Sequence, residues 1–555
     1  MSQGARGGPS SSAGGGGGAL ATCRTTSPKS RMGKGRWMKR ATPKRAISDC
    51  TRGLVSASSS ETRMVGTFER INTASAVPAP GASRSTTATL APLADSAVAA
   101  PPPLCTEVTR SWGCIDRSRA GKPALRSMMR TRVSTCTIPR VTARAVYDLR
   151  LIPARPSAEA VVWGLRHHAD LVWLDDPRGH DIVMWGASAE LDPTRGWPRQ
   201  AREALRARPT VQAPMPFVSG LVGYVGYECG AEVESMPSPP STPPLPALQL
   251  RRYEGALVRK PDGSWCAAGP RDFVDQAAQA VLEATPPPAP PAARGTETSP
   301  DPVIFRDGVR QALRAIHRGD YYQVNLSRRL VFDGVDRPLD VYRRLRRSPA
   351  SFGAYIAVPG GALLSNSPEL FLESRDGRVV SRPIKGTAPL GGDEALERDP
   401  KERAELTMIV DLVRNDLGRV CRPGSIQAGP RRVYALPTLV HAEQEVRGQL
   451  REGLDAVDLL GATFPPGSVT GAPKVSAMRA IASLEPVARG AYTGCIGYLA
   501  DGGGAQLSVA IRTASVLGSR AWVHVGCGIV ADSDPSRELE ESEVKARALR
   551  AALSG

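Results

Sequence analysis

Two carboxylates lie three residues apart at the start of an expected helix. Asp399 and Pro400 have the residue types of a helix cap and of a first helical position, and an apolar pattern of helical period follows them. Glu402 and Glu405 therefore share one face of this helix. In the simpler alternative, Glu402 bonds back to the cap residue in a capping box and has only a structural role.

The same arrangement recurs near the C-terminus. Asp534 and Pro535 precede Glu538 and Glu541, which are again three residues apart, and Lys545 follows one turn later. The simpler alternative for Glu541 and Lys545 is an ordinary ion pair on a helix surface. Two helix starts with such pairs could instead form one cage of oxygen ligands, and hard carboxylates without His or Cys suit Mg²⁺.

A lysine stands between an apolar residue and a glycine in the stretch Pro-Ile-Lys-Gly-Thr, residues 383–387. A strand-like run precedes this stretch, so Lys385 could face a buried site. An amine that is kept uncharged in such a site is a nucleophile. The alternative is a turn lysine without a chemical role.

Three further segments have the composition of anion-binding sites. Residues 467–474 place Gly and hydroxyl residues before an expected helix, 475–481, whose first N–H groups could bind an anion; the alternative is a plain turn. Arg512 lies in an expected strand, 507–513, where a guanidinium is costly unless it meets an anion such as a substrate carboxylate. Another expected strand, 521–526, ends in Gly-Cys-Gly, which either lets a ligand approach the backbone or marks a bulge.

The elements that position these residues lie in the C-terminal three quarters of the chain. Residues 146–285 mix short strand-like runs with helical ones, and the proline-rich stretch 286–302 is expected to be a linker or surface loop. Residues 303–555 alternate helical and strand patterns densely and contain every candidate residue named above. The strands expected in the first region are 171–174, 182–185, 221–227 and 256–259.

The first 145 residues differ in composition from the rest. They hold 23 Lys and Arg against 6 Asp and Glu, so they carry almost all of the net charge of +18. They are rich in Gly, Ser, Thr and Ala, and we expect a disordered basic segment. This composition suits an organellar transit peptide or, as we favour, a stretch upstream of the true start codon. The near-neutral remainder argues against a nucleic-acid-binding protein.

The cysteines and the apolar runs indicate the compartment. The 10 cysteines form no CxxC pair, which argues against structural zinc and for reduced thiols. No apolar run reaches the roughly 18 residues that a membrane span needs, and the N-terminus lacks a secretory pattern. We therefore expect a cytoplasmic protein without a membrane segment.

The order and grouping of these motifs resemble the chorismate-utilising enzymes, a family that includes anthranilate, isochorismate, salicylate and aminodeoxychorismate synthases. The resemblance is strong over residues 303–550 and thinner over 146–285, whereas residues 1–145 match nothing. The stretches that carry it are YQVNLS at 322–327, SPE at 367–369, PIKGT at 383–387, DLVRND at 411–416, GSVTGAPK at 467–474, AIRT at 510–513 and IVADSDP at 529–535.

The resemblance implies an α+β fold in which two antiparallel β-sheets pack between helices. It also implies that Glu369 is the general acid that protonates a leaving hydroxyl. His441 matches a family histidine near the substrate, and its role stays open. Mg²⁺ would face the ring carboxylate of chorismate and be held by Glu402, Glu405, Glu538 and Glu541. The residues expected to bind the substrate are Thr387, Ser468, Tyr492, Arg512, Gly528 and Lys545.

Two positions distinguish members of the family. Isochorismate and salicylate synthases place a water-activating lysine at the position of Gln323, and anthranilate synthases place alanine at that of Lys385. Lys385 is similar to the lysine of the aminodeoxychorismate synthases, whose amine attacks C2 of chorismate and displaces the C4 hydroxyl before ammonia attacks C4 and expels the lysine. The resemblance thus implies 4-amino-4-deoxychorismate as the product, on the route to 4-aminobenzoate and folate. Anthranilate synthase component I is the alternative.

Two features concern partners and regulation. No cysteine lies in a glutaminase-like elbow, so the resemblance implies a separate glutamine amidotransferase that supplies ammonia. The chain ends soon after the last expected helix, so we expect no fused lyase domain. Anthranilate synthases of the family commonly bind tryptophan as an inhibitor at a Leu-Leu-Glu-Ser stretch. Residues 173–176 here read Trp-Leu-Asp-Asp, and we expect no such inhibition.

Overall fold

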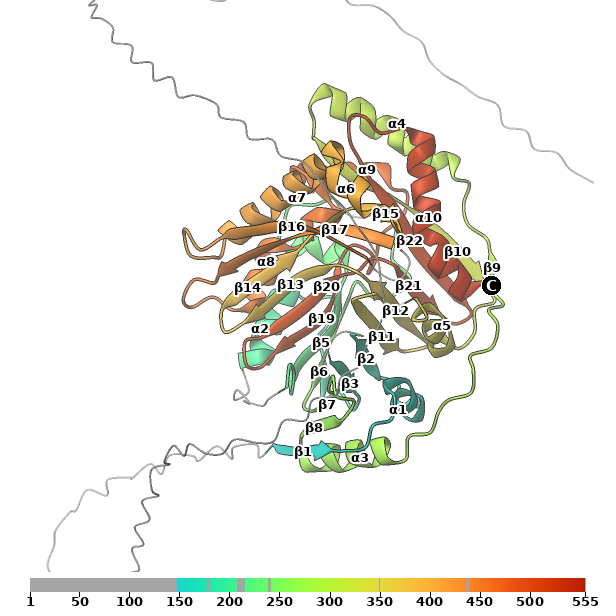
Figure 1. Ribbon diagram of the computed structural model, residues 1–555, viewed down its shortest axis with the longest axis vertical. Helices are drawn as coiled ribbons and strands as arrows, with labels where there is room; N and C mark the ends of the chain where they lie inside the picture. The colour runs from blue at the N-terminus through green and yellow to red at the C-terminus, as the bar shows by residue number, and fades with distance from the viewer. Residues whose placement is uncertain are drawn as a thin grey trace, which may run out of the picture. The chain divides into compact units, whose positions relative to one another are not determined.

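The computed structural model describes residues 147–554, apart from 177–179, 207–214, 238–240, 349 and 436–438. The expectation of a disordered segment over residues 1–145 lies outside this part of the chain. Two large antiparallel sheets, with helices packed on them, make up the part that is described (Figure 1). This arrangement confirms the expected α+β class with two antiparallel sheets between helices.

The first sheet has 12 strands and runs from the start of the described chain to its last strand. The short β9 pairs with β10 beside the main path. In spatial order the strands are β1 (Asp148–Ile152), β8 (Trp265–Gly269), β7 (Ala256–Arg259), β3 (Asp181–Met184), β2 (Val172–Asp175), β11 (Phe352–Val358), β12 (Gly361–Ser367), β21 (Thr513–Leu517), β22 (Arg520–Ile529), β10 (Gln323–Asp333) and β18 (Gly471–Ala472), with β9 at Thr296–Glu297.

The second sheet has 10 strands, all paired antiparallel. Its order is β15 (Ile384–Pro389), β17 (Leu439–Gln449), β14 (Arg378–Arg382), β13 (Leu370–Arg375), β20 (Ala505–Val509), β19 (Cys495–Ala500), β5 (Gly220–Val225), β6 (Leu248–Tyr253) and β4 (Ala189–Glu190), with β16 (Gln427–Ala435) beside β17.

Alternation along the strands divides the apolar side chains between separate cores. In β2, Val172 joins a core that both sheets share, whereas Trp173 packs on the opposite face, under helices. In β3, Ile182 and Val183 divide in the same way. Because neighbouring strand residues point to opposite faces, each sheet can bury one face against the other sheet and the second face against helices.

The helices cover the outer faces of the two sheets. α10 packs on β22 and against α4 and α5, and α7 packs on β15 and β17. The α-helices are α1 (Ala158–Gly164), α2 (Trp197–Arg206), α3 (Arg271–Leu282), α4 (Val303–Arg318), α5 (Pro338–Leu345), α6 (Asp393–Arg398), α7 (Pro400–Gly418), α8 (Ala456–Thr463), α9 (Lys474–Leu484) and α10 (Pro535–Leu553). Two 3₁₀ turns, η1 (Tyr227–Glu232) and η2 (Gly467–Val469), complete the set.

The two expected helix starts are confirmed. The Asp399 side chain accepts hydrogen bonds from the backbone N–H groups at the start of α7, and Asp534 does the same for α10. No bond from the Glu402 side chain back to the cap residue is formed in this part of the structure, so the capping-box alternative fails for Glu402. Its carboxylate is therefore free of that structural task.

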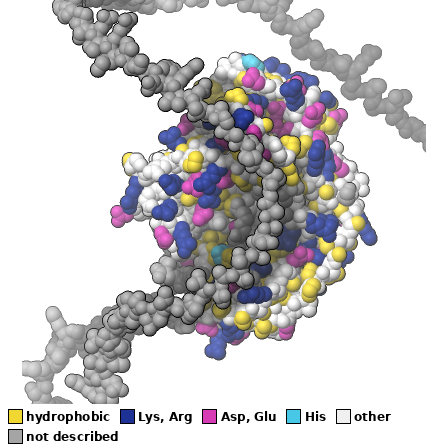
Figure 2. Space-filling view, in the orientation of Figure 1, with side chains coloured by type: hydrophobic (Ala, Val, Ile, Leu, Met, Phe, Trp, Pro, Cys, Tyr) yellow, Lys and Arg dark blue, Asp and Glu magenta, His cyan; other side chains and the backbone are white. Residues whose placement is uncertain are grey.

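The surface carries both signs of charge. Figure 2 shows Lys and Arg side chains interspersed with Asp and Glu side chains over the visible face. Among the residues described, no helix is long and apolar enough to span a membrane.

Candidate active site

The side chains of Lys385 and Gln323 converge on Gly528. Lys385 lies in β15, Gln323 begins β10, and Gly528 lies in β22, which pairs with β10. A Cβ atom at Gly528 would lie 3.0 Å from Lys385 Nζ and 2.7 Å from Gln323 Nε2. Glycine at this position therefore leaves room for both side chains. The β10–β22 register runs through Gly528 without a shift, so the Gly-Cys-Gly stretch is not a bulge.

The Gln323 side chain is buried and unpaired. The residue is 0% exposed, and neither Oε1 nor Nε2 has a hydrogen-bond partner among the residues that the structure describes. A buried polar group without a partner costs about 1–3 kcal/mol. A polar ligand beside Lys385 would satisfy this amide, and so the arrangement is typical of a binding site.

The Lys385 charge acts on carboxylates from three separate parts of the chain. Burial raises the pKa of Glu369 to about 7 and also raises that of Glu402, and the Lys385 charge opposes burial at both. Burial also acts to raise the pKa of Glu541, but the charges of Lys545 and, to a smaller extent, Lys385 lower it by more, so that this pKa is lowered overall. Lys385 forms no ion pair with a described carboxylate, so its amine stays available to a ligand.

Glu369 lies at the bend between β12 and β13 and is only 3% exposed. The Ser468 hydroxyl of η2 donates to Glu369 Oε1 at 2.6 Å. Burial is the main cause of the pKa of about 7, and the Ser468 hydrogen bond and the Lys385 charge limit the rise. A carboxyl with this pKa is partly protonated near neutral pH, as a general acid must be.

A buried ion pair supports the segment that carries Ser468. Lys474, at the start of α9, donates to Asp416 Oδ2 of α7 at 2.7 Å and to the Thr463 carbonyl at 2.7 Å. Asp416 and Lys474 are 8% and 7% exposed. Both residues belong to motifs that the sequence singled out, but their spacing did not predict that they meet.

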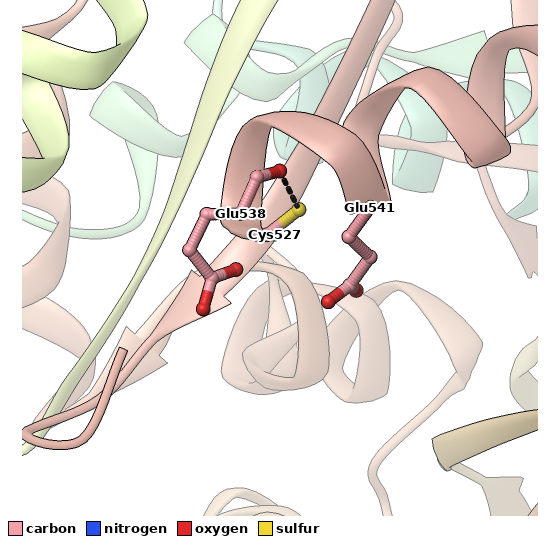
Figure 3. A group of neighbouring side chains, drawn as sticks. All are labelled: Cys527, Glu538 and Glu541. Atoms are coloured by element: carbon pink, nitrogen blue, oxygen red, sulfur yellow. Dashed lines mark hydrogen bonds between the residues drawn. The ribbon is translucent and has the colours of Figure 1, made fainter. Parts of the chain in front are cut away.

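The two pairs of glutamates differ in their surroundings. Glu538 and Glu541 at the start of α10 share their site with the Cys527 thiol of β22, and one ligand atom from each lies within 4.8 Å of the others (Figure 3). Glu402 and Glu405 of α7 are not part of this group. The sequence predicted a site of carboxylates without Cys; in the structure the packing of α10 on β22 also brings the Cys527 thiol to the acidic pair.

These carboxylates suit a cation. Glu538 Oε2 is buried and has no hydrogen-bond partner among the described residues, and burial and the nearby Glu541 raise the pKa of Glu538. At Glu402, burial raises the pKa, and the neighbouring Glu405 and Asp399 raise it further. A divalent cation would offset both the burial and the like-charge repulsion.

Lys545 bends from α10 toward β22. It donates to the Gly526 carbonyl at 3.0 Å and pairs with Glu541 at 2.7 Å, so the expected i,i+4 ion pair does form. Its charge also acts on Tyr492, whose pKa burial raises to about 12. Tyr492 is 6% exposed and stacks on the His524 ring at 5.4 Å. Lys545 therefore forms an ion pair with Glu541 and also lies near Tyr492 and the strand β22, both of which contain residues expected to bind the substrate.

His441 joins Thr387 to Arg512. Its Nδ1 lies 3.1 Å from Thr387 Oγ1, and Arg512 Nη2 donates to its Nε2 at 3.3 Å. Burial and the Arg512 charge lower the pKa of His441 to about 4, so the ring is neutral at pH 7. Because Arg512 can only donate, Nε2 accepts and Nδ1 carries the proton that is donated to Thr387.

The expected strand around Arg512 is wrong. β20 ends at Val509 and β21 begins at Thr513, and Arg512 lies between them with a positive φ of 51°. The turn points the guanidinium at His441, and Arg512 forms no ion pair in the described part of the chain. Arg512 thus lies in a turn and not in a strand, but its guanidinium is still partly buried without an anionic partner among the described residues, so we still expect it to bind an anionic ligand.

The sequence missed a buried network behind Tyr492. Arg489 is 3% exposed and donates to Glu485 Oε1 at 2.6 Å, to the Asn325 carbonyl at 2.7 Å and to Thr493 Oγ1 at 3.0 Å. Its guanidinium carbon also lies 5.7 Å from the centre of the Tyr492 ring. Glu485 and Arg489 follow the end of α9, so helical spacing could not reveal the pair.

The fold and this site define the class of protein. The chain belongs to the chorismate binding enzyme family, whose sequence model matches residues 169–551. It is 37% identical over 401 residues to "Anthranilate synthase component 1" of Streptomyces coelicolor, which covers 65% of this chain and 78% of that protein. It is 38% identical over 355 residues to "Aminodeoxychorismate synthase component 1" of Klebsiella aerogenes, which covers 60% of this chain and 77% of that protein.

A solved structure shows the same fold. Anthranilate synthase component I from Streptococcus pneumoniae aligns with a TM-score of 0.60 and 29% sequence identity, over 68% of this chain and 93% of that one. The chain is therefore a chorismate-utilising enzyme, and its relatives include both anthranilate and aminodeoxychorismate synthases at similar identity.

Proposed function

We propose that this enzyme is component 1 of an aminodeoxychorismate synthase, a transferase that aminates chorismate at C4 and retains the pyruvate group. The observation that carries the proposal is the position of Lys385, whose Nζ lies 3.0 Å from the Cβ site of Gly528. Next to it are the unpaired Gln323 amide and the buried acid Glu369. Overall identity does not separate the two kinds of synthase, so the choice depends on this lysine.

In the proposed reaction Lys385 is a nucleophile. Its free amine forms a bond to C2 of chorismate, both ring double bonds shift by one position toward C4, and the C4–O bond breaks. Glu369 donates its proton to the leaving hydroxyl, which departs as water. Ammonia then bonds to C4, both double bonds shift back, and the C2–N bond breaks to release the Lys385 amine. The new ammonium group at C4 returns one proton to the Glu369 carboxylate. The balance is chorismate and ammonia to 4-amino-4-deoxychorismate and water.

The remaining candidates would hold the substrate. Mg²⁺, when bound by Glu402, Glu405, Glu538 and Glu541, would neutralise the ring carboxylate of chorismate. The Arg512 guanidinium, which forms no ion pair with a described residue, and the Tyr492 hydroxyl would bind the enolpyruvyl carboxylate, together with Lys545 and the backbone at Gly528. His441, by accepting from Arg512 and donating to Thr387, would orient both, and Ser468 would hold the acid Glu369.

Ammonia would come from a glutamine amidotransferase subunit. The phrase "component 1" in the names of the relatives supports a second component. Incubation with ammonium salt tests the reaction without that subunit, because the salt supplies the ammonia directly.

The test is identification of the product. The purified chain with chorismate, Mg²⁺ and ammonium salt should form aminodeoxychorismate with the pyruvate group retained, measured by liquid chromatography and mass spectrometry. Anthranilate with free pyruvate as the main product would establish the alternative, an anthranilate synthase component I. Isochorismate would refute both.

A further inference from the structure

The Cys527 thiol adds a sulfur ligand to an acidic pair. Cys527 lies in β22 and is 0% exposed, and its Sγ donates to the Glu538 carbonyl oxygen at 3.2 Å. Sγ and one carboxylate oxygen from each of Glu538 and Glu541 lie within 4.8 Å of one another. Figure 3 shows Glu538 and Glu541 on successive turns at the start of α10, with the Cys527 sulfur between them.

A second observation points to a ligand at this place. Glu538 is only 8% exposed, and its Oε2 has no hydrogen-bond partner among the described residues. Buried carboxylate oxygens are almost always paired, so an unpaired one at such a cluster favours a bound cation as its partner. Glu541 is about half exposed and already pairs with Lys545, which a cation must displace or share.

The donor set favours a different cation from Mg²⁺. Mg²⁺ takes oxygen ligands, whereas Zn²⁺ and Cd²⁺ bind thiolate sulfur as well as carboxylate oxygen. A sulfur and an oxygen on one zinc ion lie at most about 4.5 Å apart, so rotation of the glutamate side chains can close the site. The cation replaces the thiol proton, which passes to solvent, and water completes the coordination.

We propose that Cys527, Glu538 and Glu541 form a binding site for a thiophilic divalent cation such as Zn²⁺, in competition with Mg²⁺. The competition with Mg²⁺ rests on the proposed function, which assigns Mg²⁺ to Glu538 and Glu541, whereas binding at the thiol itself needs neither chorismate nor ammonia. If this is so, trace Zn²⁺ or Cd²⁺ binds at the two glutamates of α10 in place of Mg²⁺.

Cadmium is the probe, because a cadmium–thiolate bond absorbs in the near ultraviolet. Reduced, metal-free, full-length protein is titrated with Cd²⁺, and the absorbance of Cys527→Ala is subtracted from that of the unaltered protein. The other nine of the 10 cysteines are common to both proteins and cancel in the difference. We expect one additional Cd²⁺ per chain, a thiolate band in the difference spectrum, and loss of that band in excess Mg²⁺.

The matched control is Cys266→Ala, which removes another buried thiol from β8. This variant should retain the band. A second variant, Glu538→Gln, keeps the thiol and should weaken Cd²⁺ binding at least about tenfold. Circular dichroism checks that each variant is folded.

Three results would overturn the proposal: a Cys527→Ala protein that binds Cd²⁺ like the unaltered one, a band that Mg²⁺ does not affect, or a Glu538→Gln protein with unchanged affinity. If Cys527→Ala does not fold, Cys527→Ser takes its place, and the same comparisons decide.

Discussion

The Nζ atom of Lys385 lies 3.0 Å from the point that a Cβ would occupy at Gly528. The second neighbour of that point is Gln323 Nε2 at 2.7 Å, and both neighbours are the far ends of flexible side chains. A methyl group at Gly528 can therefore be accommodated by the fold, but only if the lysine or the glutamine moves.

Gly528→Ala should accordingly lower kcat while the protein stays folded. A displacement of a reacting group by about 1 Å can cost about 100-fold in rate. The measurement is ammonia-dependent turnover together with the melting temperature. Gly461→Ala in α8 adds the same methyl group where the nearest side-chain atom is 3.9 Å away, and it should keep full activity. Unchanged turnover in Gly528→Ala would show that Lys385 and Gln323 do not need their present positions.

The hydrogen bond from Ser468 to Glu369 should set the pH range of the reaction. Burial raises the pKa of Glu369 to about 7, and the Ser468 bond acts in the opposite direction. Activity that needs protonated Glu369 is present below this pKa and lost above it. Ser468→Ala removes the lowering contribution, so the alkaline limb of kcat/KM should move up by roughly one pH unit.

Ser508→Ala is the control for this experiment, because Ser508 is also buried and donates only to a backbone carbonyl, that of Ile496. Its pH profile should match that of the unaltered enzyme. A limb that stays in place in Ser468→Ala, or moves to lower pH, would exclude Glu369 as the titrating acid.

Tryptophan should not inhibit the enzyme. The Trp173 ring is 0% exposed, and its Nε1 donates to Asp181 at 3.0 Å. The Arg346 guanidinium lies 4.5 Å from the centre of this ring and pairs with Asp175 at 2.7 Å. Trp173 and Asp175 therefore already have partners within the protein. We expect unchanged activity and melting temperature in saturating tryptophan. Inhibition at micromolar tryptophan would count against this and would favour the anthranilate alternative.

We propose that residues 1–145 take no part in catalysis. All candidate residues lie between Gln323 and Lys545, and the described strands begin with β1 at Asp148–Ile152. Deletion of residues 1–140 should therefore leave the melting temperature and the ammonia-dependent activity nearly unchanged. A large fall in melting temperature would mean that the deleted segment contributes contacts to the fold.

The sequence predicted local features of the site better than long-range ones. The helix starts at Asp399 and Asp534 follow from capping residues, and the i,i+3 glutamate pairs follow from helical spacing. The meeting of Gln323, Lys385 and Gly528 depends on which strands pair, and no local pattern records that.

Two residues, Arg512 and Cys527, show why the rest could not be predicted. Arg512 has neighbours of strand-forming types, but its φ of 51° places it in a turn, because the chain must cross from β20 in one sheet to β21 in the other. Cys527 has no acidic neighbour in the sequence closer than Asp532. It reaches Glu538 and Glu541 only because α10 folds back onto β22.

The most direct test of the account is to look for a covalent adduct at Lys385. Chorismate is incubated with the protein and Mg²⁺ without ammonia, the complex is trapped, and its peptides are mapped by mass spectrometry. If Lys385 is the nucleophile, the peptide that contains it should carry an adduct of chorismate less water. Lys385→Ala should show no adduct and no amination, while chorismate still binds. Full amination by Lys385→Ala, with no adduct in the unaltered protein, would contradict the account and favour direct attack of ammonia at C4.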